Sequence, residues 1–189
     1  WADGDTRFAG SISARGGAAG GDGGFVEVSG KQQLDVQGSV DLTANKGKGG
    51  TLLFDPTDIT IGAVAGTVPP NNVGTPDVAF ADVPANYVIQ VTPALRGYSE
   101  LWLQATNNIT LNTALAMNLG NAVRFDANNS ININAAITAS GGITLNSANG
   151  TISSLAAGTL TSTGAANANA GNVSITAAGN VSLLGAIAA

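Results

Sequence analysis

Short runs of alternating apolar and polar residues recur along the whole chain, and each run ends at Gly, Ser, Asn or a Lys-Gln-Gln corner. Within residues 23–44 three such runs follow one another, at 25–28, 34–36 and 40–42. Alternation over so few residues is typical of a strand with one buried face, and Gly and Asn tolerate tight corners. A spacing of 3.6 residues is sustained nowhere, so the pattern predicts many short strands and no helix.

The second half of the chain repeats itself. Residues 101–112 (LWLQATNNITLN) align with residues 123–134 (VRFDANNSININ) without a gap, and similar runs begin at 137 and 173. A period near 20 residues, with two or three strands and no helix, predicts a right-handed parallel β-helix whose coils rise by ~4.8 Å each. The aligned apolar pairs are Leu101/Val123, Leu103/Phe125, Ala105/Ala127, Ile109/Ile131 and Leu111/Ile133.

Stacking explains why the unit has to be repeated. One coil buries too few apolar side chains to offset the cost of ordering its backbone, whereas stacked coils add hydrogen bonds and a second buried interface. Equivalent outward positions then lie one strand spacing apart, where like charges repel and Thr, Ser and Asn form ladders. We expect a single domain over residues 1–189 that is dry inside and largely uncharged outside.

One segment departs from the period. Residues 63–97 contain all but one of the six prolines, and proline cannot donate to a strand ladder. We therefore predict a Pro-rich insertion out of the coil at 63–97. Within it the run YVIQV, at residues 87–91, is expected to form an extra strand.

Composition narrows the functional classes. The 189 residues carry a net charge of −5 with seven Lys plus Arg, so the basic footprint of a nucleic-acid-binding protein is absent. The chain has no Cys and no His, which removes disulfides, thiolate nucleophiles, zinc sites and an imidazole base. From residue 127 to 189 there is no charged and no aromatic residue, and the apolar runs are too short to span a membrane as a helix.

Residues 1–62 resemble the large exoproteins of bacterial two-partner secretion, the filamentous-haemagglutinin-like adhesins. The resemblance rests on linked motifs in a fixed order; beyond residue 62 only a generic strand, Asn and Gly pattern matches. The motifs are WADGDTRFAG at 1–10, GGDGGFVEVSGK at 20–31, VDLTA at 40–44 and GTLLFDPTDITI at 50–61.

This resemblance implies a long secreted right-handed β-helical rod on the bacterial cell surface, exported through an outer-membrane transporter barrel. Its implied partners are a host or neighbouring-cell surface or glycan. A terminal coil exposes unpaired strand edges. We therefore expect the chain to be a section of a longer protein, continued or capped at both ends, with end-to-end or lateral self-association.

Aromatic and charged residues gather in and just after the insertion, and we take them as a candidate contact surface because aromatics with Arg favour contacts. The alternative is a structural role, in which these residues pack the insertion against the coil. The candidate residues are Phe80, Tyr87, Arg96, Tyr98, Glu100 and Trp102.

Carboxylates provide the rival hypothesis of a polysaccharide-active enzyme on the same scaffold, because such enzymes place acids on adjacent coils. The candidates are Asp35, Asp41, Asp55 and Asp58, and solvated edges and corners are the competing interpretation. The run GGDGG around Asp22 resembles a calcium-binding repeat, but those repeats work in tandem and this one is single. We predict no cofactor, no metal and no catalysis.

Five N-x-S/T sequons begin at Asn108, Asn128, Asn149, Asn172 and Asn180. A corner Asn followed by a strand generates the same pattern without any modification. The function expected from the sequence is therefore a structural or adhesive section of a surface rod. The alternatives are an enzyme on the same scaffold and a self-assembling fibre that binds no ligand.

Overall fold

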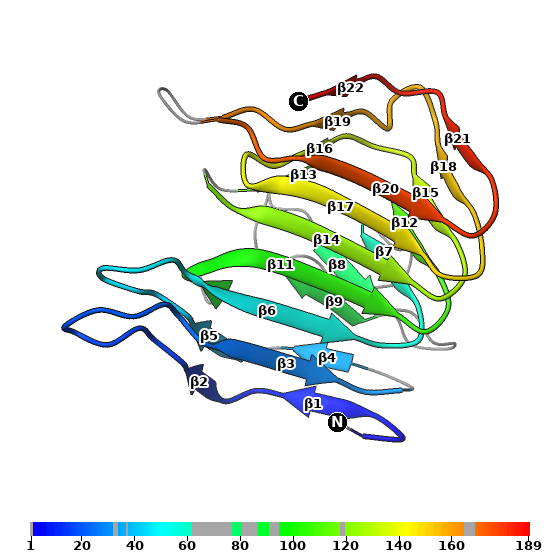
Figure 1. Cartoon of the computed structure of the whole chain (residues 1–189). Coiled ribbons are helices and arrows are strands. Elements are labelled where there is room, and N and C mark those ends of the chain that lie inside the picture. Colours follow the sequence, from blue (N-terminus) through cyan, green and yellow to red (C-terminus); the bar gives the residue numbers. More distant parts are fainter. Residues whose placement is uncertain are drawn as a thin grey trace.

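The computed structural model describes residues 2–31, 34–36, 38–61, 77–80, 87–90, 95–117, 120–164 and 169–189. These residues form 22 strands and no helix, which confirms the prediction from the alternating pattern. Among them there is consequently no apolar helix of the length that a membrane crossing needs. The strands stack as successive coils from the N-terminal to the C-terminal end (Figure 1).

The first sheet is the longest-stranded side of the coil and runs through the whole stack. Its six strands all pair in parallel, in the spatial order β3-β6-β11-β14-β17-β20. Their bounds are β3 Phe25–Ser29, β6 Gly50–Asp55, β11 Tyr98–Ala105, β14 Ala122–Ala127, β17 Gly142–Ser147 and β20 Val173–Ala177.

After each of these strands the chain turns a corner and forms a strand on the second side of the coil. Five parallel strands pair in the order β7-β12-β15-β18-β21, and β1 pairs in parallel with β4 nearer the N-terminus. The bounds are β1 Thr6–Phe8, β4 Leu34–Val36, β7 Ile59–Ile61, β12 Ile109–Leu111, β15 Ile131–Ile133, β18 Ile152–Ser154 and β21 Val181–Leu183.

The third side closes the triangle with very short strands. It consists of two parallel groups, β2-β5-β10 and β13-β16-β19-β22. The bounds are β2 Ser11–Ser13, β5 Ser39–Asp41, β10 Leu95–Arg96, β13 Leu115–Ala116, β16 Ile137–Thr138, β19 Leu160–Thr161 and β22 Ile187–Ala188.

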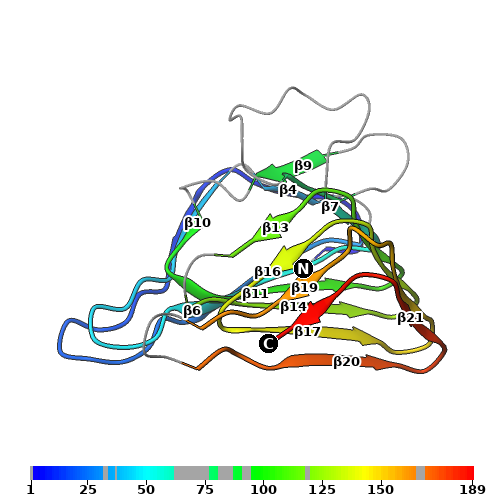
Figure 2. The same cartoon turned by 90° about the horizontal axis from the view of Figure 1, so that it is seen from above.

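Figure 2 looks down this stack and shows the triangular outline of the coil. Seen from the C-terminal end, the chain runs anticlockwise through β20, β21 and β22 as it advances toward the viewer, so the coil is right-handed. Leu101 pairs with Val123 and Val123 with Ile143, which are steps of 22 and 20 residues. The parallel β-helix and the gapless alignment of residues 101–112 with 123–134 are therefore confirmed.

The segment of the predicted insertion contributes an antiparallel hairpin to the second sheet. β8 (Asp77–Phe80) pairs antiparallel with β7, and β9 (Tyr87–Gln90) pairs antiparallel with β8. β9 also contacts β4, so the hairpin occupies the space between the β4 and β7 coils. The strand expected at 87–91 is present over Tyr87–Gln90; residues 62–76, 81–86 and 91–94 lie outside the described residues.

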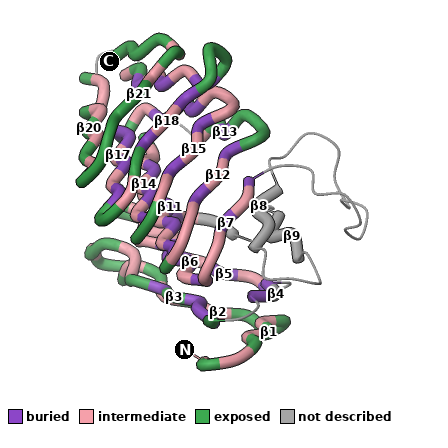
Figure 3. The backbone as a smooth tube through the Cα atoms, turned by 90° about the vertical axis from the view of Figure 1, so that its right-hand side faces the viewer, coloured by how far each residue is buried: buried purple, intermediate pink, exposed green. Residues whose placement is uncertain are grey.

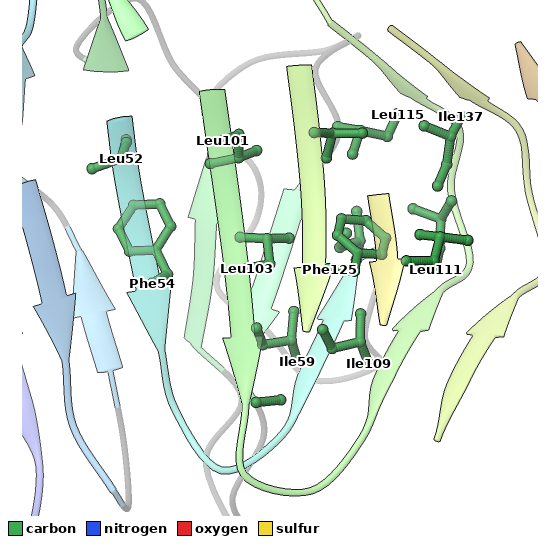
Figure 4. Packing of buried hydrophobic residues seen from close by; sticks show 14 of the residues in the cluster. Leu52, Phe54, Ile59, Leu101, Leu103, Ile109, Leu111, Leu115, Phe125 and Ile137 are labelled. Atoms are coloured by element: carbon green, nitrogen blue, oxygen red, sulfur yellow. The ribbon is translucent and has the colours of Figure 1, made fainter. Parts of the chain in front are cut away.

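The core is a set of inward columns that run along the stack. One column carries Val28, Phe54, Leu103, Phe125 and Leu145 on successive strands of the first sheet, and all five are buried. Figure 4 shows Phe54, Leu103 and Phe125 pointing inward toward the isoleucines and leucines of the other sides. Alternate residues of each strand supply the column because side chains of a strand alternate between its two faces.

Corners between sheets are held by side-chain amides and by glycines. Asn134 Nδ2 donates to Asn112 Oδ1 at 2.8 Å, and Asn149 Nδ2 donates to Asn128 Oδ1 at 2.8 Å. Gly158 lies so close to the coil beneath it that a β-carbon there would overlap the carbonyl oxygen of Ile133. The ladders that the sequence predicts for uncharged outer positions are present at these corners.

Burial falls off at the C-terminal coil (Figure 3). Inward positions that are buried in the middle of the stack, such as Leu145, give way to partly exposed residues such as Ile175 on β20. Val181 and Ile187 of the same coil are exposed. This coil has a neighbour on one side, so its apolar side chains are half covered.

Candidate binding surface

The outward positions of the first sheet change character along the stack. On β17 and β20 they are small and polar, such as Thr144 and Thr176. From β3 to β14 they include large aromatic, apolar and charged side chains, so the expectation of a largely uncharged outside is wrong for these coils. We call this set the Trp102 surface: Phe25, Glu27, Leu53, Asp55, Glu100, Trp102, Gln104, Arg124 and Asp126.

Trp102 lies at the centre of this surface and bridges several coils. Its ring packs edge-on against Phe25, with 6.4 Å between centroids and 63° between planes. On the other side its Nε1 donates to Asp126 Oδ2 at 2.7 Å. Leu53 of the intervening strand also faces outward, yet it is only 5% exposed. Phe25 and Trp102 therefore form an aromatic platform on the outside of the rod, with the almost fully covered Leu53 on the strand between them.

Arg124 completes the central cluster. Its guanidinium carbon lies 4.2 Å from the centre of the Trp102 ring, which is a cation–π contact. Its Nε also donates to Asp126 Oδ2 at 2.6 Å. Asp126 thus accepts two hydrogen bonds on one oxygen, while its Oδ1 is buried without a hydrogen-bond donor. The Arg124 guanidinium, the Trp102 ring and the Asp126 carboxylate therefore fix one another's positions across β11 and β14.

Asp55 is the most perturbed acid of the surface. Burial first, and the negative charge of Glu27 on the neighbouring strand second, raise the pKa of Asp55 to about 6. Gln104 Nε2 lies 3.4 Å from Asp55 Oδ2, and the other oxygen of Asp55 is buried without a donor. The ionised form of this carboxylate is therefore poorly stabilised compared with an ordinary surface aspartate.

A shallow depression adjoins the surface where the first sheet turns toward the second. Five of its eight lining residues have polar side chains, and the only ionisable one among them belongs to Asp126. The depression extends the hydrogen-bonding groups of the surface toward β17. Its polar lining residues are Gln104, Thr106, Asp126, Asn128 and Asn146.

The residues proposed from sequence as a contact surface lie on three different sides of the coil. Glu100 and Trp102 lie together on β11, and Tyr98 at the start of that strand is buried, which raises the pKa of its hydroxyl. Phe80 lies opposite Tyr87 in the β8–β9 hairpin of the second sheet. Arg96 lies on β10 in the third side, and the side chains of these last three residues are outside the described set.

The four candidate carboxylates are also distributed. Asp35 lies on β4, and Asp41 on β5, where it lies 3.8 Å from Arg15 Nε and accepts from Thr43. Asp55 ends β6. Asp58 follows in the corner. In the described part of the chain no group of three or more acidic residues is placed to hold a metal ion.

Asp58 and Asp22 each bind backbone or amide groups of a neighbouring coil. Asp58 Oδ1 accepts from the Asn108 backbone N–H at 3.0 Å, and its Oδ2 accepts from Asn107 Nδ2 at 3.2 Å. Asp22 Oδ1 accepts from the Lys48 backbone N–H at 2.8 Å. Both contacts tie one corner to the next, as a stacked coil requires.

Sequence reasoning found Trp102 and Glu100 but missed Phe25, Arg124 and Asp126 as their neighbours. Two signals existed. The alignment of residues 101–112 with 123–134 pairs Trp102 with Arg124 and Gln104 with Asp126. GGFVEV at 23–28 aligns with GGTLLF at 49–54, which places the outward residues of β3 and β6 in one register. A comparison of the chain with protein-family models, with curated proteins and with solved structures finds no match.

Proposed function

We propose that this chain is a structural and adhesive section of a secreted bacterial surface rod. The observation that carries the proposal is the stack itself: all six strands of the first sheet pair in parallel, with one register shift at the start of β11. A body of this kind is stiff along its axis because each coil is hydrogen-bonded to its neighbours. The motif resemblance over residues 1–62 supplies the cellular setting.

The mechanism is passive. Stacked coils keep an exposed surface at a fixed distance from whatever anchors the rod, and the chain performs no catalysis. In this proposal an outer-membrane transporter barrel exports the protein, and its targets are host or neighbouring cells and their glycans. The partly covered apolar residues of the β20–β22 coil support a further stacking contact, either end to end or lateral.

The location can be tested with an antibody raised against residues 1–189. We expect the antibody to label intact cells of the producing bacterium, and labelling to disappear when the partner transporter gene is deleted. Beads coated with the chain should adhere to target cells, and bare beads should not. Labelling that needs permeabilised cells, or coated beads that adhere no better than bare ones, would reject the proposal.

A polysaccharide-active enzyme is the second candidate, and the specific observation in its favour is Asp55. A carboxyl with a pKa of about 6 beside Glu27 has the protonation behaviour of a general acid. Polysaccharide cleavage by the chain, lost in Asp55→Asn and Glu27→Gln and kept in Asp58→Asn, would establish it. We expect none of these proteins to cleave polysaccharide.

A further inference from the structure

The Trp102 surface carries large apolar side chains where the packing of the coil does not require them. Phe25 points away from the core, and 55% of it is exposed. Exposed apolar side chains that lie together, rimmed by polar groups, mark binding sites more often than scattered single ones do. Phe25 is the exposed member of this group, Trp102 is partly exposed, and Leu53 on the strand between them is almost fully covered; carboxylates and amides surround the two aromatic rings.

The surface is also long in one direction. From β3 to β17 there are four strand spacings, about 19 Å. The aromatic platform occupies the β3 end of this span, and the polar depression that includes Asn146 occupies the β17 end. A ligand that covers the surface therefore has an apolar face at one end and several hydrogen-bonding groups along its length.

Charge decides which kind of ligand fits. Four carboxylates, those of Glu27, Asp55, Glu100 and Asp126, face one guanidinium, so the surface repels anions. The position over the indole ring that a ligand cation would take is already filled by Arg124, at 4.2 Å. A neutral ligand meets no charge repulsion, and it can pack on the exposed ring of Phe25 instead of the Trp102 face that Arg124 covers.

We infer that the Trp102 surface binds a neutral oligosaccharide. Pyranose rings have an apolar C–H face that packs on aromatic rings, and their hydroxyls both donate and accept hydrogen bonds. Carboxylate oxygens accept hydrogen bonds from such hydroxyls, and the side-chain amides of Gln104 and Asn146 can both donate and accept hydrogen bonds. This inference deepens the adhesive role proposed above and rests on it for its biological meaning, although binding itself can be measured independently.

Two exposed apolar residues provide a matched pair of variants. Phe25→Ala removes the exposed edge of the platform and leaves the core intact. Leu155→Ala removes a side chain of similar exposure, 54%, that lies outside the Trp102 surface in the turn after β18. Both are made in a Trp1→Phe background, so that Trp102 is the sole tryptophan and its fluorescence reports the surface directly.

The parent chain is first applied to an array that holds neutral, sialylated and sulfated oligosaccharides and Lys-rich peptides. The best neutral oligosaccharide is then titrated while Trp102 fluorescence is followed. We expect binding to neutral oligosaccharides that shifts the emission, at least tenfold weaker binding by Phe25→Ala, and unchanged binding by Leu155→Ala. No binding to any neutral oligosaccharide, binding confined to anionic glycans or cationic peptides, or equal binding by Phe25→Ala would overturn the inference.

The two proposals fail in different ways. If coated beads adhere to cells equally well with parent and Phe25→Ala protein, and the titration shows equal oligosaccharide binding, the rod is adhesive but this surface is not its saccharide site. If the antibody labels only permeabilised cells while Phe25→Ala weakens oligosaccharide binding, the site stands and the surface-rod role is rejected.

Discussion

Removing one ring from the middle of the stack gives the sharpest test of the core. Phe125 on β14 is fully buried and pairs in register with Leu103 on one side and Leu145 on the other. Phe125→Ala leaves a cavity that two rigid neighbouring coils hold open. The same column ends at Ile175 on the last coil, which is only partly buried and has one neighbour.

The two sites differ in expected cost. Truncating a fully buried Phe to Ala costs about 3–5 kcal/mol in free energy of unfolding. For a chain of this size that lowers Tm by about 6–20 °C. Ile175→Ala should cost less than about 2 kcal/mol because that side chain is already partly exposed and has a neighbouring coil on one side.

Urea unfolding followed by far-UV circular dichroism measures both variants, and hydrogen exchange locates the loss. We expect Phe125→Ala to weaken protection across β11, β14 and β17, and Ile175→Ala to weaken it only in the β20–β22 coil. Equal costs for the two substitutions, or a cost below about 1 kcal/mol for Phe125→Ala, would refute the in-register column.

Three further predictions address a corner, an acid and a glycine. Asp58→Ala should cost about 1.5–3 kcal/mol in urea unfolding, because amide donors of the next coil lose a charged acceptor, whereas Asp3→Ala, which removes an exposed ion pair, should cost under about 1 kcal/mol; similar costs would contradict this role of the corner. The pKa of Asp55 rises from 3.8 to about 6 on folding, so this group stabilises the fold when protonated, and that contribution disappears as pH rises from about 4 through 6. Asp55→Asn should flatten the fall in unfolding free energy measured between pH 4 and 7, and an unchanged slope would speak against the shift. Gly158→Ala should lower the unfolding free energy by about 1–3 kcal/mol through overlap with the coil beneath, whereas Gly4→Ala, where a β-carbon meets no atom, should be neutral, and a neutral Gly158→Ala would mean that the coils are further apart.

The stacking of the coils could be predicted from sequence because the spacing of the repeats gives the register between neighbouring strands. The two residues of each pair, Leu101/Val123 and Ile109/Ile131, are 22 residues apart in the sequence, and the structure pairs the same residues. Where the period is kept, each inward residue has to be apolar on every coil, so the pattern is strongly constrained.

The partners of the hairpin strands and the contact between Phe25 and Trp102 could not be predicted from the repeats, for physical reasons. Two antiparallel strands, β8 and β9, join a parallel sheet at a place where the period is lost, so no repeat indicates their partners. Phe25 and Trp102 meet across an intervening strand and 77 positions of chain. Outward residues obey no core constraint, and their contacts follow only once the register of β3, β6 and β11 is known.

The central claim is that each coil lies directly on the next in register, and disulfide cross-linking tests it most directly. The chain has no cysteine, so introduced pairs report without background. Thr110, Asn132 and Ser153 occupy one outward column on β12, β15 and β18, with Asn132 hydrogen-bonded to both neighbours. Adjacent positions lie about 4.8 Å apart, and alternate ones about 9.6 Å, beyond the reach of a disulfide.

We predict that Thr110→Cys/Asn132→Cys and Asn132→Cys/Ser153→Cys form intramolecular disulfides on mild oxidation, identified by mass spectrometry of linked peptides, and that Thr110→Cys/Ser153→Cys remains reduced. Efficient linkage of the Thr110→Cys/Ser153→Cys pair, or failure of both adjacent pairs in folded protein, would contradict the stacked coil.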